Sequence, residues 1–374
     1  MKNKKSAMID VKTVNLVNHL FDPNAENITL DLERLFKKLG NAHDRDPSTP
    51  LMRNMMDIVM LHHMSIDGEA RIYTLREACK SIADEIDRDA LEPAPPFHNR
   101  KHFMFMQLAG CAIDTKNAAL YNQFKHEMRI PKLNDTDLAC LMVARAMHDL
   151  GHPGGTNGSG KNYRPMQFEN AAIGRARPIL ELNNVDPRDI KTIEMIVRAT
   201  DPGMPHKIMV EAYNFHFNPH TPKEALYWDE MFKDFDEETQ TQLGDLTKAL
   251  FTDPKLCFMA ACLCDSDTLP SFGVSKDMNY QTTVDLNNEF IENGLPPLLD
   301  GKGQMIPAGQ AYALVNVVGT RPTEDGQHEA NFRTPGAHHL GSAVARQLQL
   351  NAEEMLTPQQ KTGIYALAGI RLAA

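Results

Sequence analysis

The segment HDLGHPGGTN has the residue types and spacing of a metal site. It brings His148, Asp149 and His152 into five positions, directly after the apolar run LACLMVARAM. An apolar run of this kind predicts a buried helix that ends near the first histidine. Imidazole and carboxylate groups at such a helix end can bind a metal ion, and glycine lets the backbone pass closely over it. The alternative is an ordinary capped helix end followed by a proline–glycine turn.

A second histidine pair lies upstream, in the segment FHNRKHF. His98 and His102 are four positions apart, so they share one face if the segment is helical. This spacing would aim two imidazoles at one point. Taken alone, the pair is equally typical of an exposed helix surface.

Two further polar residues interrupt apolar stretches. Asp265 directly follows the run LCFMAACLC, where a carboxylate is costly to bury unless a cation meets it. Its neighbour Asp267 is the competing candidate for the same role. Gln310 stands alone in PAGQAYALVNVV, where an amide can donate to and accept from the edge of a ligand. A solvent-exposed glutamine at a helix start is the alternative.

The elements that position these residues are predicted to be helices. Apolar residues recur three and four positions apart, and Thr74 with Glu77, like Thr221 with Glu224, fits a capping box. Cap residues followed by proline mark five helix starts, one of them again Thr221 and the others at Thr49, Asp186, Asp253 and Thr357. The fold class is therefore predicted to be all-α, a multi-helix bundle. Residues 319–340 are rich in turn formers and predict a loop or mobile arm, with a final helix from about Thr357.

Composition excludes several classes of function. The chain has 374 residues and a formal net charge of −10, without the basic stripe of a nucleic-acid-binding protein. It contains no run of about 18 apolar residues and no signal-peptide pattern, which predicts a cytoplasmic protein with no membrane partner. Six cysteines without a CxxC pair predict buried free thiols. The sequence does not indicate the oligomeric state of the protein.

The ordered set of histidine and aspartate motifs resembles the HD superfamily of metal-dependent phosphohydrolases. Within it, the chain is similar to the class I catalytic domain of the 3′,5′-cyclic nucleotide phosphodiesterases. FHNRKH resembles the family's Tyr-His-Asn-x-x-His, and HDLGHPGGTN resembles its His-Asp-x-x-His-Pro-Gly-x-x-Asn. QFENAAIGRARPIL, IVRATDPGMPH and EFIENGLPPLLD are similar to later family segments in the same order. The resemblance implies an all-helical catalytic domain over 12–318, with its metal-site core at 95–318, and a polar loop and helical tail over 319–374.

The resemblance also implies a role for each matching residue. A tightly bound ion, Zn²⁺ in the first instance, would be held by His102, His148, Asp149 and Asp265. Asp149 would bridge to a second ion, Mg²⁺ or Mn²⁺, whose water molecules would be oriented by His152 and Glu169. His98 would be the general acid, and the base of a small-molecule substrate would contact Gln310, Tyr312 and Leu314.

The implied reaction is hydrolysis of cyclic AMP or cyclic GMP to the 5′-monophosphate by a metal-activated hydroxide. Two departures concern the metal segments: Gly151 stands where the family has Asp, and Phe97 where it has Tyr. The sequence SDTLPS after Asp265 leaves the choice between Asp265 and Asp267 open. Ala313 occupies the position of the aromatic residue that stacks on the base. The alternatives are an HD-type phosphohydrolase acting on another nucleotide or phosphodiester, and a non-catalytic nucleotide sensor.

Overall fold

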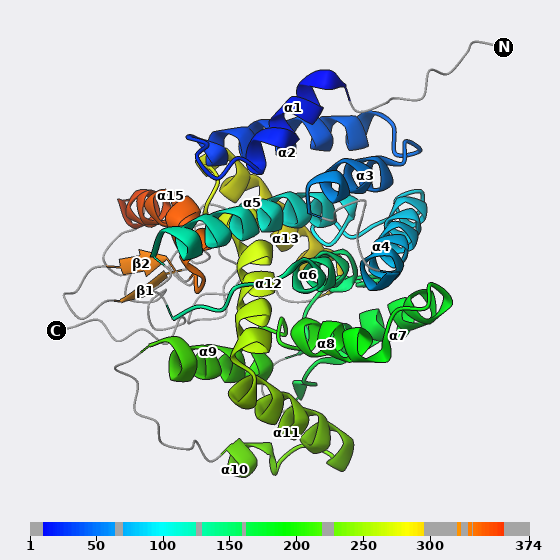
Figure 1. Cartoon of the computed structure of the whole chain (residues 1–374), viewed down its shortest axis with the longest axis vertical. Coiled ribbons are helices and arrows are strands. Elements are labelled where there is room, and N and C mark those ends of the chain that lie inside the picture. The colour runs from blue at the N-terminus through cyan, green and yellow to red at the C-terminus, as the bar shows by residue number, and fades with distance from the viewer. Residues whose placement is uncertain are drawn as a thin grey trace.

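The computed structural model describes residues 10–63, 70–124, 129–158, 162–218, 228–294, 320–322, 328–330 and 332–354. Within these ranges the regular structure is helical apart from one two-stranded ribbon, which confirms the predicted all-α class (Figure 1). The elements are α1 (Val11–Leu20), α2 (Ile28–Arg45), α3 (Leu51–His63), α4 (Ala70–Asp89), α5 (Arg100–Phe124), α6 (Asp135–Met147), α7 (Gln167–Leu182), α8 (Pro187–Arg198), α9 (Met204–Phe217), α10 (Trp228–Phe232), α11 (Glu237–Thr252), α12 (Pro254–Phe272), α13 (Lys276–Glu292), β1 (Thr320–Pro322), β2 (His328–Ala330) and α15 (Pro335–Glu354).

Helix α12 forms the centre of the bundle. It contacts α5, α6, α8, α9, α11, α13 and α15, and it runs through the middle of the molecule in Figure 1. Its sequence explains this place, because the run LCFMAACLC has no polar face and every residue from Leu256 to Ser266 is buried. A helix that is apolar on all sides is stable only when it is surrounded.

Two of the predicted helix starts are confirmed by their caps. The Asp186 carboxylate accepts from the backbone N–H of Arg188, and α8 begins at Pro187. The Asp253 carboxylate accepts from the N–H of Leu256 at 3.0 Å, and α12 begins with a proline in the same way. Proline at the first helical position loses nothing by lacking an N–H.

The predicted capping box at Thr74 and Glu77 is wrong. Both residues lie inside α4, which begins at Ala70, and the Thr74 hydroxyl donates to the carbonyl of Arg71 instead. The apolar face of this helix is confirmed, since its three-and-four spaced side chains are buried, namely Leu75, Ala78, Ile82 and Ile86. The starts predicted at Thr221 and Thr357 lie outside the described residues.

The C-terminal part is more regular than predicted. Strands β1 and β2 pair antiparallel with Thr320 opposite Ala330, and α15 packs against α5 and α12. The predicted loop or arm over 319–340 is therefore wrong for residues 335–340, which form the start of α15. Burial explains the difference, because Phe332 and Ala337 are enclosed in the core. The domain boundary at 318 stays a prediction, because residues 295–319 lie outside the described ranges.

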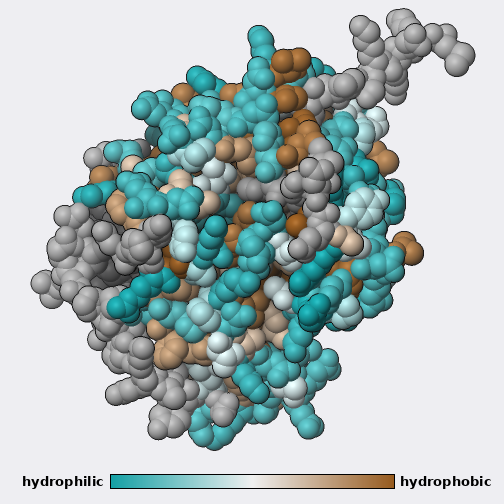
Figure 2. All heavy atoms as spheres, viewed as in Figure 1, coloured by the Kyte–Doolittle hydropathy of each residue, from teal (hydrophilic) through white to brown (hydrophobic). Residues whose placement is uncertain are grey.

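Two predictions from composition can be compared with the fold. All six cysteines are buried and unpaired, which confirms the predicted free thiols. None of the described helices combines the length and the hydropathy needed to cross a bilayer. On the face shown in Figure 2, hydrophilic side chains predominate, and hydrophobic ones are interspersed among them.

A buried guanidinium fixes the start of α5, which carries the candidate site. Arg100 is 2% exposed, and its Nη1 donates to the carbonyl of Thr49 at 2.6 Å and to Asp87 Oδ1 at 2.9 Å. Its Nη2 lies 2.9 Å from Nδ1 of His43, which must accept because arginine has only donors. These contacts tie α5 to α2, α4 and the segment before α3.

This network predicts a loss of stability in acid. Burial, and then the charge of Arg100, lower the pKa of His43 from 6.5 to about 4. Between these values the unfolded chain binds a proton that the folded chain excludes, so the stability present above pH 6.5 is lost as the pH falls toward 4. We expect His43→Gln, which keeps an acceptor but does not titrate, to lose less free energy of unfolding between pH 7 and pH 5. Urea unfolding at both pH values measures this. An equal loss of unfolding free energy in the variant and the unchanged chain would show that His43 does not cause the acid sensitivity.

Candidate metal centre

His102 lies in the first turn of α5. The helix starts where Asn99 Oδ1 accepts from the backbone N–H of Lys101 at 2.9 Å, while Asn99 Nδ2 donates to the carbonyls of Pro95 and Pro96. Asparagine is well suited to this position because its side chain satisfies an N–H that has no partner in the helix. The proline-rich segment is thereby fixed against the start of α5, next to His102.

His148 and Asp149 lie at the end of α6, as predicted. The helix ends at Met147, and His148 is its C-cap. Nδ1 of His148 lies 3.1 Å from the carbonyl oxygen of Arg145, to which it donates a hydrogen bond. The lone pair of Nε2 is therefore available to bind a metal ion. Gly151 then takes a φ of +76°, a conformation that favours glycine, and turns the chain away from the helix end.

The ligand atoms of three residues converge on one point. Nε2 of His102 lies 3.3 Å from Nε2 of His148 and 3.2 Å from Oδ2 of Asp149. Nε2 of His148 lies 2.7 Å from the same oxygen. A tetrahedral ion with bonds of about 2.0–2.1 Å holds its ligand atoms about 3.3 Å apart. Two of the three separations match this spacing and the third is shorter, and the donor set suits a divalent ion such as Zn²⁺.

The charges of His148 and Asp149 shift each other's pKa values. Burial lowers the pKa of His148, but the Asp149 carboxylate outweighs it and raises that pKa to about 9. Burial raises the pKa of Asp149, and His148 and His102 together shift it well below its ordinary value. A histidine must be neutral to bind a metal, so metal binding here would displace a proton.

The structure distinguishes between the two aspartates that the sequence leaves open. Asp267, not Asp265, faces the imidazoles, with its Oδ1 3.3 Å from Nε2 of His102 and 3.9 Å from Nε2 of His148. The Asp265 carboxylate is directed to the start of α15, where it accepts from the N–H groups of Arg333 and Thr334 and from the Thr334 hydroxyl. Two residues along a helix are about 200° apart, so only one of the two can face the site.

Asp265 is thus a structural anchor, and its replacement should destabilise the fold. The carboxylate is 2% exposed; burial raises its pKa to about 6, although hydrogen bonds from Thr334 and Arg333 oppose this. We expect Asp265→Asn to lower the free energy of unfolding by about 1–3 kcal/mol, because its amide N–H₂ would face donors. Thr334→Val removes one of the three bonds and should cost less. Urea unfolding of both variants tests this, and an unchanged Asp265→Asn protein would contradict it.

His98 precedes α5 and does not share a helical face with His102, contrary to the prediction. It still reaches the site, with its Nε2 3.9 Å from Oδ2 of Asp149. Its Nδ1 lies 2.5 Å from Oε1 of Glu289, on α13. Burial lowers the pKa of His98, but the hydrogen bond to Glu289 and the charge of Asp149 outweigh it, so the pKa is raised overall.

Glu289 lies at the candidate site, although the sequence analysis did not identify it. Its carboxylate is fully buried and accepts from the N–H groups of Phe97, His98 and Gly155, at 3.0, 2.9 and 3.1 Å. Burial raises its pKa, and the hydrogen bond from His98 lowers it more, to about 2. One ionised carboxylate therefore joins the His98 segment to the glycine turn after α6. The segment EFIENGLPPLLD contains it, but no local signal separates it from other helical glutamates.

His152 and Glu169 take different places around the centre. The ring of His152 stacks on His98 with centroids 3.9 Å apart, and burial followed by the charge of His98 lowers its pKa to about 4. With His98 and Asp149 it forms a second group whose ligand atoms lie within 4.8 Å of one another. Glu169 accepts from Asn157 Nδ2 at 2.9 Å, and burial, with Asp201 nearby, raises its pKa to about 8.

The predicted substrate residues Gln310, Tyr312 and Leu314 lie outside the described residues. The predicted site residues that the structure brings together are His98, His102, His148, Asp149 and His152. Asp267 lies beside them, whereas Asp265 faces the start of α15. Two candidate groups share Asp149, which is the arrangement that two neighbouring ions would need.

Comparisons with known proteins add little to this geometry. No family model matches the chain, and no curated protein matches it. Among solved structures, the phosphodiesterase domain of the RhoPDE fusion protein from the choanoflagellate Salpingoeca rosetta is similar over 94% of each chain. Its sequence identity is 14% and its TM-score is 0.43, values too low to support an inference about fold or function. The functional interpretation therefore depends on the residues of the site.

Proposed function

We propose that this protein is a metal-dependent hydrolase that opens a 3′,5′-cyclic nucleotide, cyclic AMP or cyclic GMP, to its 5′-monophosphate. The observation that supports it is the convergence of His102, His148 and Asp149 on one point, with His98 next to Asp149. A metal centre beside an imidazole of raised pKa combines a cation for the phosphate with a proton donor for the leaving oxygen.

The four residues His102, His148, Asp149 and Asp267 would hold the tighter ion, which we propose to be Zn²⁺. Asp149 would be shared with a second ion, Mg²⁺ or Mn²⁺. Two such ions neutralise the phosphodiester and lower the pKa of a bound water. His152 would lie beside the second ion, where its neutral ring could accept a hydrogen bond, and Glu169 would help to orient water there.

His98 would act as the general acid. Its Nδ1 donates to Glu289, so the ring is fixed and Nε2 is directed toward Asp149. During hydrolysis the oxygen of water forms a bond to phosphorus, one proton of that water passes to solvent, and the bond from phosphorus to O3′ breaks. The proton on Nε2 goes to O3′, which leaves as a hydroxyl, and the phosphate remains on O5′. Proton donation of this kind contributes about 10²–10⁴-fold to a rate.

Base recognition belongs to the same proposal. Gln310 would read the edge of the base, and Tyr312 and Leu314 would pack beside it. An amide can present either its donor or its acceptor, so one glutamine suits adenine and guanine alike.

Hydrolysis of cyclic nucleotides by the purified chain tests the proposal. The protein is incubated with cyclic AMP or cyclic GMP, with Mg²⁺ or Mn²⁺, and with excess EDTA as the matched control. We expect release of the 5′-monophosphate and none of the 3′-monophosphate, with turnover lost in EDTA and restored by the metal. Bound metal without turnover of either nucleotide would contradict the proposed substrate and favour another phosphodiester. Turnover that persists in EDTA would contradict the metal-dependent mechanism.

A further inference from the structure

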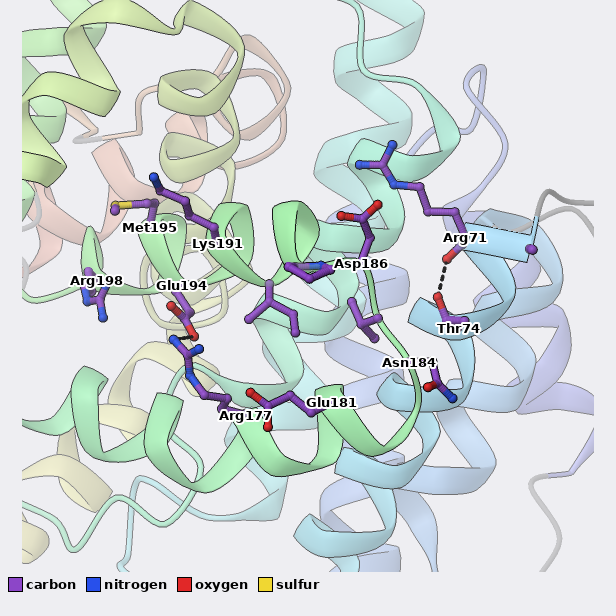
Figure 3. A pocket seen from close by; sticks show the side chains of 14 residues that line it. Arg71, Thr74, Arg177, Glu181, Asn184, Asp186, Lys191, Glu194, Met195 and Arg198 are labelled. Carbon is purple, nitrogen blue, oxygen red and sulfur yellow. Dashed lines mark hydrogen bonds and ion pairs between the residues drawn. The ribbon is translucent and has the colours of Figure 1, made fainter.

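A cavity of about 900 Å³ lies between α4, α7 and α8, and its lining contains no residue of the candidate metal centre. Figure 3 shows Arg177, Glu194 and Arg198 gathered at one end, and Arg71 with Thr74 at the other. A volume of this size accommodates a small organic molecule.

Arg198 is a half-buried cation of this cavity with a single side-chain hydrogen bond among the described residues. Its Nε donates to Asn170 Oδ1 at 3.0 Å. Among the described residues, no carboxylate lies within ion-pair distance of its guanidinium. Burial is the main reason that the pKa of Arg198 is lowered. A guanidinium that is partly removed from water without a paired anion is a binding group for phosphate or carboxylate.

The surrounding charges favour an anion. Arg177 pairs with the buried carboxylate of Glu194, and Lys191 adds an exposed ammonium group in the part of the chain that the structure describes. Glu181 is the second carboxylate at this end and is exposed. Over the whole lining, four cationic side chains face three carboxylates, namely Arg71, Arg177, Lys191 and Arg198 against Glu181, Asp186 and Glu194. Asp245 also acts on Arg198 without lining the cavity.

An apolar surface lies beside these charges. Val185, Ile190 and Met195 line the cavity and are 4%, 6% and 8% exposed, so little of their surface is in contact with water. A ligand with a hydrocarbon or aromatic body next to its anionic group could contact this apolar wall and pair with Arg198 at the same time.

We propose that this cavity binds a small anionic molecule, whose phosphate or carboxylate group pairs with Arg198 and whose apolar body packs on Val185, Ile190 and Met195. Guanidinium groups bind both kinds of anion through two parallel hydrogen bonds. The site is separate from the metal centre and does not depend on the proposed hydrolysis.

Calorimetric titration of the full chain with phenyl phosphate and with benzoate tests the proposal and distinguishes the two anions. EDTA is kept in the buffer so that no metal-bound phosphate contributes. We expect saturable binding of one molecule per chain for at least one probe. Arg198→Gln should weaken it about tenfold or more, the cost of a lost charge-assisted hydrogen bond. Arg198→Lys should weaken it less, since the charge remains.

Lys191→Glu provides a second test on an exposed residue, in case Arg198→Gln does not fold, and it should also weaken binding. Lys233→Gln, outside the cavity and 63% exposed, is the matched control and should bind like the unchanged chain. The proposal is overturned if neither probe binds at concentrations up to about 10 mM, or if binding survives both cavity variants. Binding that is lost in Asp149→Asn would also overturn it, because the anion would then lie at the metal centre.

Discussion

Asp149→Asn is expected to abolish hydrolysis of cyclic nucleotides. The Asp149 carboxylate belongs to both candidate metal groups, so a single substitution removes a ligand from each. An amide carries no charge and presents its N–H₂ toward the cations. Loss of an outer partner of a metal site typically costs 10–100-fold, and loss of a shared ligand should lower kcat by about 10³-fold or more.

Steady-state kinetics with saturating Mn²⁺, together with the metal content of the protein, measures this effect. Asp57→Asn is the matched control, because that carboxylate is 51% exposed and lies on α3, which carries none of the candidate ligands. A variant of Asp149 that keeps both its bound metal and its kcat would contradict the assignment of Asp149 as a bridging ligand.

His98→Asn should reduce kcat for a cyclic nucleotide by about 10²–10⁴-fold. The reduction should be much smaller for a p-nitrophenyl phosphodiester, because p-nitrophenolate leaves without a proton. Nε2 of His98 lies 3.9 Å from Oδ2 of Asp149, farther than the three converging ligand atoms lie from one another, so the tighter ion should be retained.

The comparison of the two substrates separates a proton donor from a structural residue. His339→Asn, an exposed histidine on α15, is the matched control and should behave like the unchanged chain on both substrates. An equal loss on both substrates, or loss of the metal, would show that His98 holds the site together instead of donating a proton.

Local patterns predicted the parts of the site that depend on neighbouring residues. The end of α6 at His148 follows from an apolar helical run and the glycine and proline residues after it. Asp186 and Asp253 cap their helices because capping involves only the next few backbone groups. The same local reasoning wrongly predicts a helix start at Thr74, because α4 begins one turn earlier and continues past this residue.

The parts that were not predicted depend on contacts between distant segments. Asp265 and Asp267 follow the same apolar run, and the rotation of α12 within seven neighbouring helices decides which of them faces His102. Glu289 reaches His98 across 191 positions of the chain. A single sequence does not indicate which distant residues are in contact. The sequence predicts a loop at the start of α15 for the same reason, since this start is stabilised by its distant partner Asp265.

Equilibrium binding of Zn²⁺ to the stripped chain tests the central claim most directly, because it measures the metal centre without assuming a substrate. Zn²⁺ bound per chain is measured by dialysis for the unchanged protein and for two variants, Asp267→Asn and Asp265→Asn. The account predicts one tight ion per chain, which is lost or strongly weakened in Asp267→Asn and retained in Asp265→Asn. Absence of a tight ion in the unchanged chain, or loss of it only in Asp265→Asn, would contradict the account.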